Sequence, residues 1–280
     1  MTAGVDTVRE LRERTGAGIM DCKAALLESN GDMEKAVDYL RKKGMASAAK
    51  RAGREAKEGL IGIEIKGQDA ILAEANCETD FVARTGDFKA LLELALAQTA
   101  AHGDAALQSD KVTQRVAELS GKIGEKILIR RVKKLKSSGG TFFSYLHSNQ
   151  KLGVVIELGV AKADSAKNAA FQELGKNLAM QVAASNPLCL TRAEVPAAAM
   201  EREKAIYREE VKGKPENIIE KILSGKLDKF YQANCLIEQP FIKDDKQSVK
   251  ALIEQVSKQL GDTVQVKQFV RYQLGETVSQ

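Results

Sequence analysis

The feature that most limits how this chain can fold is a faint internal repeat. Ile71 and Val154 lie 83 residues apart in the return strands of two expected β-hairpins, and Phe88 and Phe171 are separated by the same 83 residues in the helices that follow. A fixed offset indicates two copies of one supersecondary unit. We interpret the sequence as a duplicated β-β-α-β unit, with chance similarity of two hairpin–helix segments as the alternative.

Each expected copy contains two strands with alternating apolar residues, an amphipathic helix and a last strand that carries arginine. In the first copy these are residues 60–65, 70–75, a helix around 88–95 and 127–132; in the second they are 142–147, 154–158, a helix from about 169, and 268–272. Arg130 and Arg271 of the last strands are 141 residues apart, which is 58 more than the offset of 83. The second copy therefore contains an insertion.

The insertion follows Asn186-Pro187 and covers about residues 188–240. Residues 193–212 and 216–231 have helical spacing, and the turn Gly213-Lys214-Pro215 joins them into an antiparallel helical hairpin. The hairpin carries balanced charge and a broad apolar stripe, which favours contact with a partner protein or self-association.

The N-terminal part has the spacing of three short helices and then becomes strongly basic. Residues 41–58 hold seven basic and two acidic side chains among small residues, which is typical of an exposed helix or linker. The predicted organisation is a three-helix module at 1–45, a basic linker at 46–58, and core subdomains at 59–139 and 140–280. The expected fold class is α+β.

Composition excludes several classes of function. The 43 basic and 38 acidic residues give a net charge of +5, which is low for a nucleic-acid coat. No apolar run approaches the ~20 residues that span a bilayer, and the charged start lacks a secretory signal, so we expect a cytoplasmic protein without a membrane partner.

The chemistry-bearing residues are sparse. The four cysteines are far apart in the sequence, the two histidines lie in no metal-ligand spacing, and no phosphate-binding glycine loop is present. We therefore expect no metal, no cofactor and no enzyme activity.

Two stretches resemble a known family. Residues 11–26 read LRERTGAGIMDCKAAL and residues 76–83 read NCETDFVA. They are similar to the two signatures of the elongation factor Ts family, and the similarity extends over nearly the whole chain. It implies a ubiquitin-associated-like N-terminal module, the duplicated core and the inserted hairpin. It also implies a guanine-nucleotide exchange factor for the GTPase elongation factor Tu, with no nucleotide binding of its own.

The second signature supports two interpretations. From the residues alone, Thr79 or Asp80 caps a short helix and Phe81 fills the local core, with Val82 beside it. The resemblance implies instead that Phe81 is exposed and enters between two helices of the GTPase near its Mg²⁺ site, with Asp80 directing the loop.

The resemblance also implies further partner contacts, although each residue has a plainer interpretation. Ile19 and Leu26 should largely fill the module's core, and the tip of a hairpin is a usual place for a solvated histidine. The implied contact residues are Arg12, Ile19, Met20, Lys23, Ile123, Gly124, His147, Lys176, Asn177 and Gln181.

Two other functions remain open at this level. The basic strand at 130–136 is the best case for RNA binding, but it lacks interleaved aromatic residues for base stacking. The three-helix module alone would suit a peptide-binding adaptor. A nucleotide-exchange assay separates these alternatives from an exchange factor.

Overall fold

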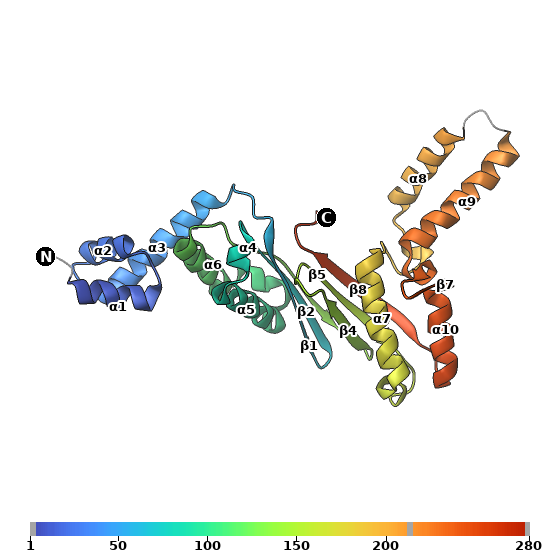
Figure 1. Cartoon of the computed structure of the whole chain (residues 1–280), viewed down its shortest axis with the longest axis horizontal. Coiled ribbons are helices and arrows are strands. Elements are labelled where there is room, and N and C mark those ends of the chain that lie inside the picture. Colours follow the sequence, from blue (N-terminus) through green and yellow to red (C-terminus); the bar gives the residue numbers. More distant parts are fainter. Residues whose placement is uncertain (1–3, 212–214, 278–280) are drawn as a thin grey trace. The chain divides into compact units, whose positions relative to one another are not determined.

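The computed structural model describes residues 4–211 and 215–277 (Figure 1). The chain divides into two compact units. The first comprises the chain up to Leu135, residues 146–152 and the chain from Tyr272; the second comprises residues 136–145 and 153–271. Both contain helices and β-sheet, so the predicted α+β class is confirmed. None of the described helices is long and apolar enough to cross a membrane.

Three helices open the first unit: α1 (Val5–Thr15), α2 (Ile19–Glu28) and α3 (Met33–Arg51). Helix α1 ends where Gly16 takes a left-handed conformation with φ of 68° and donates its N–H to the Arg12 carbonyl. Asp32 caps the start of helix α3, because its carboxylate accepts the Lys35 N–H. The helices pack around a small core of Leu11, Cys22, Ala25, Leu26 and Ala36.

Helix α3 continues to Arg51, so the first part of the predicted linker at 46–58 is helical. Alanine, lysine and arginine favour a helix when packing supports it. The support comes from α6 (Asp110–Ile123), where a Cβ built on Gly121 would lie 3.4 Å from the Gly44 Cα. Arg51 donates to the Ser120 carbonyl at 3.2 Å.

The first unit's sheet has the strand order β1-β2-β3. Strands β1 and β2 pair antiparallel from Glu58↔Cys77 to Lys66↔Asp69. The helix α5 packs on these strands through Phe88, Leu91 and Leu92, all of which are buried. The elements are β1 (Glu58–Lys66), β2 (Asp69–Cys77), α4 (Asp80–Ala83), α5 (Gly86–His102), α6 and β3 (Leu128–Lys136).

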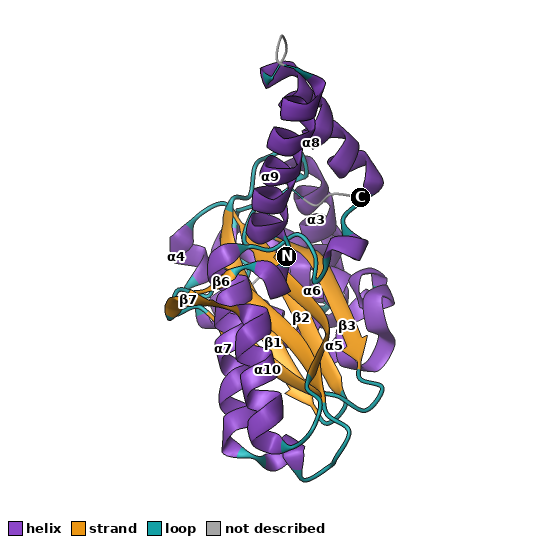
Figure 2. Cartoon of the chain, turned by 90° about the vertical axis from the view of Figure 1, so that its right-hand side faces the viewer, coloured by secondary structure: helices purple, strands orange, loops and turns teal. Residues whose placement is uncertain are grey.

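The second unit's sheet has the corresponding order β4-β5-β8. Helices α7 and α10 lie side by side in this unit (Figure 2). Its elements are β4 (Thr141–Leu146), β5 (Leu152–Gly159), α7 (Ala169–Ser185), α8 (Ala197–Glu210), α9 (Glu216–Asn234), β6 (Pro240–Phe241), β7 (Asp244–Ser248), α10 (Val249–Leu260) and β8 (Gln265–Gln273). Short 3-10 helices cover Gly103–Gln108, Ser165–Lys167, Arg192–Glu194 and Leu236–Glu238.

The predicted β-β-α-β unit needs correction, because each copy has a second long helix before its last strand. These helices, α6 and α10, begin alike: Ser109 and Ser248 cap them by accepting backbone N–H groups of the first turn. They also end alike, at left-handed Gly124 and Gly261. The arginine-bearing strands thus follow α6 and α10.

The inserted hairpin consists of α8 and α9, which contact each other. Helix α8 is shorter than the predicted 193–212, and α9 runs on to Asn234. Of the predicted turn, Gly213 and Lys214 lie outside the described residues, whereas Pro215 directly precedes α9.

Candidate functional site

The T-D-F-V signature forms a short, well-anchored turn of helix directly after β2. The Thr79 hydroxyl accepts the Val82 N–H at 3.4 Å and caps α4. Val82 and Ala83 are buried and fix the turn to the core. Phe81 points away, with 78% of its surface exposed. The interpretation of Phe81 as a core residue is therefore wrong, whereas capping by Thr79 is confirmed.

A reciprocal clamp holds the base of this loop. The Glu125 carboxylate accepts the Glu78 and Thr79 N–H groups, each at 3.1 Å, and the Thr79 hydroxyl at 2.7 Å. In return, the Glu78 carboxylate accepts the Lys126 N–H at 2.6 Å, which lowers the pKa of Glu78 below its ordinary value. Charge-assisted bonds of this kind are strong. An exposed aromatic side chain thus stands on a fixed support.

The clamp brings together two of the predicted contact stretches. Ile123 and Gly124 end α6 directly before Glu125, so they lie next to the Phe81 loop in the chain's fold. Ile123 is half-buried and packs against the core of the first unit. Gly124 has a φ of 87°, a conformation that favours glycine.

Asp80 lies on the outer side of the same loop. Its carboxylate pairs with Arg84 at 2.7 Å one turn later, and both side chains are partly exposed. Asp80, Arg84 and Lys89 line a shallow cavity of about 330 Å³ together with Ser148 and Lys151 of the β4–β5 turn. The exposed His147 lies at the start of that turn, where its backbone N–H donates to the Leu152 carbonyl.

The first signature presents a second exposed surface. Ile19 and Met20, at the start of α2, are 54% and 75% exposed, and Arg12 and Lys23 are exposed beside them. A groove of about 380 Å³ runs between α1 and α2, lined by Val5, Val8, Arg9, Arg12, Ile19 and Lys23. The expectation that Ile19 fills the core is wrong, because Leu11, Cys22, Ala25 and Leu26 already complete it.

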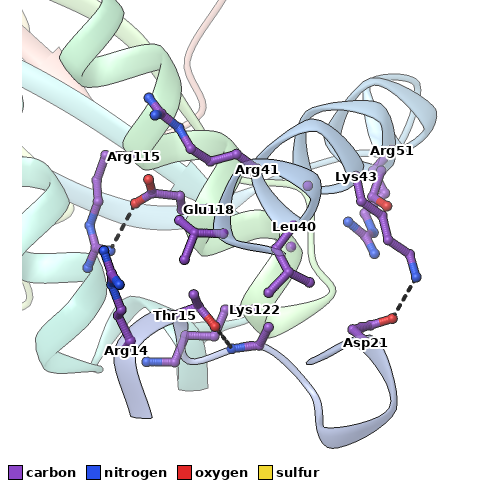
Figure 3. Close-up of a pocket in the computed structure, with 15 residues that line it drawn as sticks. Arg14, Thr15, Asp21, Leu40, Arg41, Lys43, Arg51, Arg115, Glu118 and Lys122 are labelled. Carbon is purple, nitrogen blue, oxygen red and sulfur yellow. Dashed lines mark hydrogen bonds and ion pairs between the residues drawn. The ribbon is translucent and has the colours of Figure 1, made fainter. Parts of the chain in front are cut away.

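A larger cavity of about 400 Å³ lies where the N-terminal helices meet α6 (Figure 3). Basic side chains outnumber acidic ones in its lining, and five of the six basic side chains bind other groups of the protein. Lys43 pairs with Asp21 at 2.8 Å, and Arg115 reaches Glu118 at 3.6 Å (Figure 3). The remaining engaged cations pair as Arg14–Glu34, Lys122–Asp87 and Arg51 with the Ser120 carbonyl. The cavity therefore lies between packed helices whose charged side chains bind one another.

Most basic side chains of strand β3 also form ion pairs within the protein. Arg130 and Arg131 both reach the fully buried carboxylate of Glu74, the second at 2.7 Å. Arg131 also stacks over the Tyr272 ring at 3.9 Å. Lys133 and Lys134 pair with Asp104 and Asp69. These contacts leave little charge for the phosphates that RNA binding requires. Among the described residues, no group of three or more side chains could hold a metal ion.

The chain is similar to known proteins over nearly its whole length. A sequence model of the family described as elongation factor TS matches residues 78–276. The chain belongs to the elongation factor Ts family. A protein named elongation factor Ts from Nitratidesulfovibrio vulgaris is 46% identical over 99% of this chain and 97% of its own length. The protein of the same name from Prosthecochloris aestuarii is 45% identical over 96% of this chain and 97% of its own length. That from Lawsonia intracellularis is 41% identical over 99% of this chain and 100% of its own length.

Membership in the elongation factor Ts family makes the chain a translation elongation factor. Of the three residues on α7 that were expected to contact a partner, only one is exposed. Lys176 is exposed, but Gln181 is fully buried. The Gln181 amide donates to the Gln239 side chain and the Pro240 carbonyl, and its oxygen accepts the Ile242 N–H. A side chain held in this way has no surface for a partner, so the expectation for Gln181 is corrected. Asn177 is almost as buried and accepts from Lys243 at 2.8 Å.

Sequence reasoning missed the residues that support the elongation factor Ts signature. Glu125 stands 46 residues from Thr79, and its role depends on three hydrogen bonds that no local pattern reveals. The available signal was its position directly after Ile123-Gly124, a stretch already implied by the resemblance. Arg84, which pairs with Asp80, was also overlooked although the i, i+4 spacing was present.

Proposed function

We propose that this protein accelerates GDP release from elongation factor Tu and so allows GTP to reload. The observation that supports the proposal most is Phe81, 78% exposed on a loop clamped by Glu125. A large aromatic side chain exposed on a fixed support is a typical interface anchor, worth roughly 2–4 kcal/mol when it is truncated. No covalent chemistry is involved.

The mechanism rests on linkage between two binding equilibria. A protein that binds the nucleotide-free GTPase more tightly than the GDP form must weaken GDP binding by the same factor. We propose that Phe81 enters between two helices of the GTPase, while Asp80 engages polar groups beside its Mg²⁺ site. The entry of Phe81 and the contacts of Asp80 would both disturb the loop of the GTPase that holds the β-phosphate of GDP.

The N-terminal module would supply the docking energy. Ile19 and Met20 offer apolar surface at the start of α2, with Arg12 and Lys23 as a charged rim. Methionine adapts readily to a partner surface. We propose that this ubiquitin-associated-like module docks on the nucleotide domain of the GTPase, and that His147 and Lys176 add contacts away from the nucleotide. We further propose that the protein acts in the cytoplasm and consists of the three-helix module, a basic linker after α3, and two core subdomains.

Stopped-flow release of fluorescent GDP from elongation factor Tu tests the proposal. Micromolar amounts of this protein should increase the release rate, and the increase should saturate as the binary complex forms. An RNA-binding protein or a peptide-binding adaptor would leave the rate unchanged. An unchanged rate, in the presence of correctly folded protein, would reject the exchange function.

A further inference from the structure

Two cysteine side chains meet at the neck of the helical hairpin formed by α8 and α9. Cys189 lies shortly before α8 and Cys235 directly follows α9, and they form an isolated parallel β-bridge. Their Sγ atoms are 3.7 Å apart. Cys189 is 7% exposed and Cys235 is fully buried. The pair plays no part in the proposed exchange mechanism.

The backbone around the pair fixes this approach. The Leu188 N–H donates to the Asn234 carbonyl at 2.8 Å, and the Leu236 N–H donates to the Cys189 carbonyl at 2.9 Å. Beyond the bridge, the Arg192 guanidinium binds the Glu238 carboxylate through two bonds of 2.5 and 2.6 Å. The two segments are therefore held side by side on both sides of the sulfurs.

We propose that Cys189 and Cys235 are a modification site that forms a reversible disulfide bond. A disulfide requires sulfurs about 2.05 Å apart and Cα atoms usually about 4.4–6.8 Å apart. Adjacent strands lie about 4.8 Å apart, so residues paired across a β-bridge satisfy the second condition. Side-chain rotation then has to close less than about 2 Å between the sulfurs, without movement of the backbone.

The oxidant is a peroxide, and the disulfide bond forms in two steps. Cys189, the more accessible thiol, takes one oxygen from hydrogen peroxide to form a sulfenic acid and releases water. Cys235 then attacks the Cys189 sulfur; the S–S bond forms, the S–O bond breaks, and the hydroxyl leaves as water with the Cys235 proton. A dithiol reverses the reaction by disulfide exchange.

Burial makes this reaction slow and dependent on pH. It raises the pKa of the Cys189 thiol above its ordinary value and that of Cys235 to about 12. Because the thiolate is the reactive form, disulfide formation should accelerate as pH rises. The Arg192 guanidinium lowers the pKa of Cys235, but by less than burial raises it, and the Glu194 and Glu238 carboxylates raise the pKa of Cys189 further.

The bond would join both ends of the hairpin covalently. It closes a loop that contains α8 and α9 entirely, so that a chain break inside the hairpin no longer separates the fragments. Cross-links of long loops also stabilise the folded state against local opening. Oxidised and reduced protein should thus differ in how the hairpin responds to proteolysis.

The full-length protein is treated with hydrogen peroxide at pH 8, digested briefly with trypsin and compared on gels with and without dithiothreitol. Fragments cut within the hairpin should stay joined without reductant and separate with it. Peptide mapping should find one peptide pair, Cys189 with Cys235, lighter by two hydrogen atoms. Cys22→Ser, a matched change of a buried cysteine elsewhere, should leave the cross-link intact, whereas Cys189→Ser should abolish it.

The peptide map of the unaltered chain decides the question even if a variant folds poorly. Fragments that separate without reductant, with both thiols still free or carrying oxygen alone, would overturn the proposal. A disulfide that joins two chains would overturn it as well. Faster cross-linking at pH 9 than at pH 7, with reversal by dithiothreitol, is the result that the geometry predicts.

Discussion

Phe81 is the residue at which stability and function should separate. Its side chain is 78% exposed, so Phe81→Ala leaves no cavity and should change the free energy of unfolding by less than about 1 kcal/mol. The same change should lower the stimulation of GDP release at least ~10-fold, which corresponds to about 1.4 kcal/mol of lost coupling. Urea denaturation and stopped-flow release measure the two effects.

A matched control for this change is Ile206→Ala, which truncates a 44% exposed apolar side chain on α8. It should leave both unfolding and exchange near the unaltered values. If Phe81→Ala instead unfolds at much lower urea concentration, the residue has a structural role and the wedge mechanism loses its central contact.

Glu125 should matter for exchange without touching the GTPase. Glu125→Ala removes the acceptor of two N–H groups and of the Thr79 hydroxyl, so the loop that carries Phe81 loses its support. We expect lower maximal stimulation of GDP release, with Glu125→Gln recovering part of it because an amide oxygen still accepts. Equal exchange by all three proteins would show that the loop needs no clamp.

Asp262 should control stability in acid. Its carboxylate accepts the N–H groups of Ala161, Lys162 and Thr263, and the bond from Lys162 contributes most to a pKa lowered to about 2. Since the pKa in the unfolded chain is about 3.9, the stabilisation is present above pH ~4 and is lost as pH falls towards 2. Asp262→Asn should therefore lower Tm at pH 7 and have a smaller effect near pH 2. A Tm difference that is constant across this range would contradict the assignment.

At the scale of elements, sequence patterns identified some structures well and others not at all. The two β-hairpins were recognisable because apolar residues alternate on both sides of a polar turn. Helices α6 and α10 were not predicted, although Val112 and Val116, like Val249 and Val256, have helical spacing, because the repeat was interpreted with a single helix before each last strand. Glu125 and Gln181 could not be assigned, since their partners lie far away in the sequence.

The two copies fill the space between helix and sheet in opposite ways: in the first the glycine lies on the strand and the large side chains on the helix, and in the second the reverse holds. In the first copy, Gly62 on β1 faces Leu92 and Leu96 of α5. In the second, Phe143 of β4 fills the space and the glycine is Gly175 of α7. Leu92 and Gly175 are separated by the same 83 residues as the repeat. One large residue and one glycine meet in each case, so the repeat preserves packing where it does not preserve residue type.

This arrangement predicts unequal costs for two glycine changes. A Cβ on Gly175 would come within 2.3 Å of the buried Phe143 ring, whereas one on Gly62 would lie 2.9 Å from the end of the flexible Leu96 side chain. Gly175→Ala should destabilise by about 1–3 kcal/mol despite the higher helix propensity of alanine. Gly62→Ala should cost less, as urea denaturation can measure. The reverse order would mean that the Phe143 ring moves away easily.

At the scale of the whole molecule, the repeat explains the two sheets but not the insertion. Both sheets have a hairpin as two neighbouring strands and the arginine-bearing strand at the third position. After the hairpin, the first unit carries the exposed Phe81 loop, whereas Gln181 in the second unit is fully buried. Exposed loop residues such as Phe81 differ between the two copies, and a hydrophobic pattern does not encode them.

The helical hairpin should be dispensable for folding and for most of the exchange activity. Among the described residues, α8 contributes no buried side chain to the second unit, and the first copy of the repeat has no such insertion. Replacing residues 192–231 with a short glycine–serine linker keeps Cys189, Cys235 and the Ala233 carbonyl, which accepts from Gln239. The shortened protein should show a cooperative melt and stimulate GDP release to a similar extent. Sedimentation velocity of both proteins tests the self-association that the hairpin's balanced charge and apolar stripe favour, because removal of such a surface would convert a dimer to monomers. A melt that loses cooperativity would show instead that α8 and α9 belong to the core of the second unit.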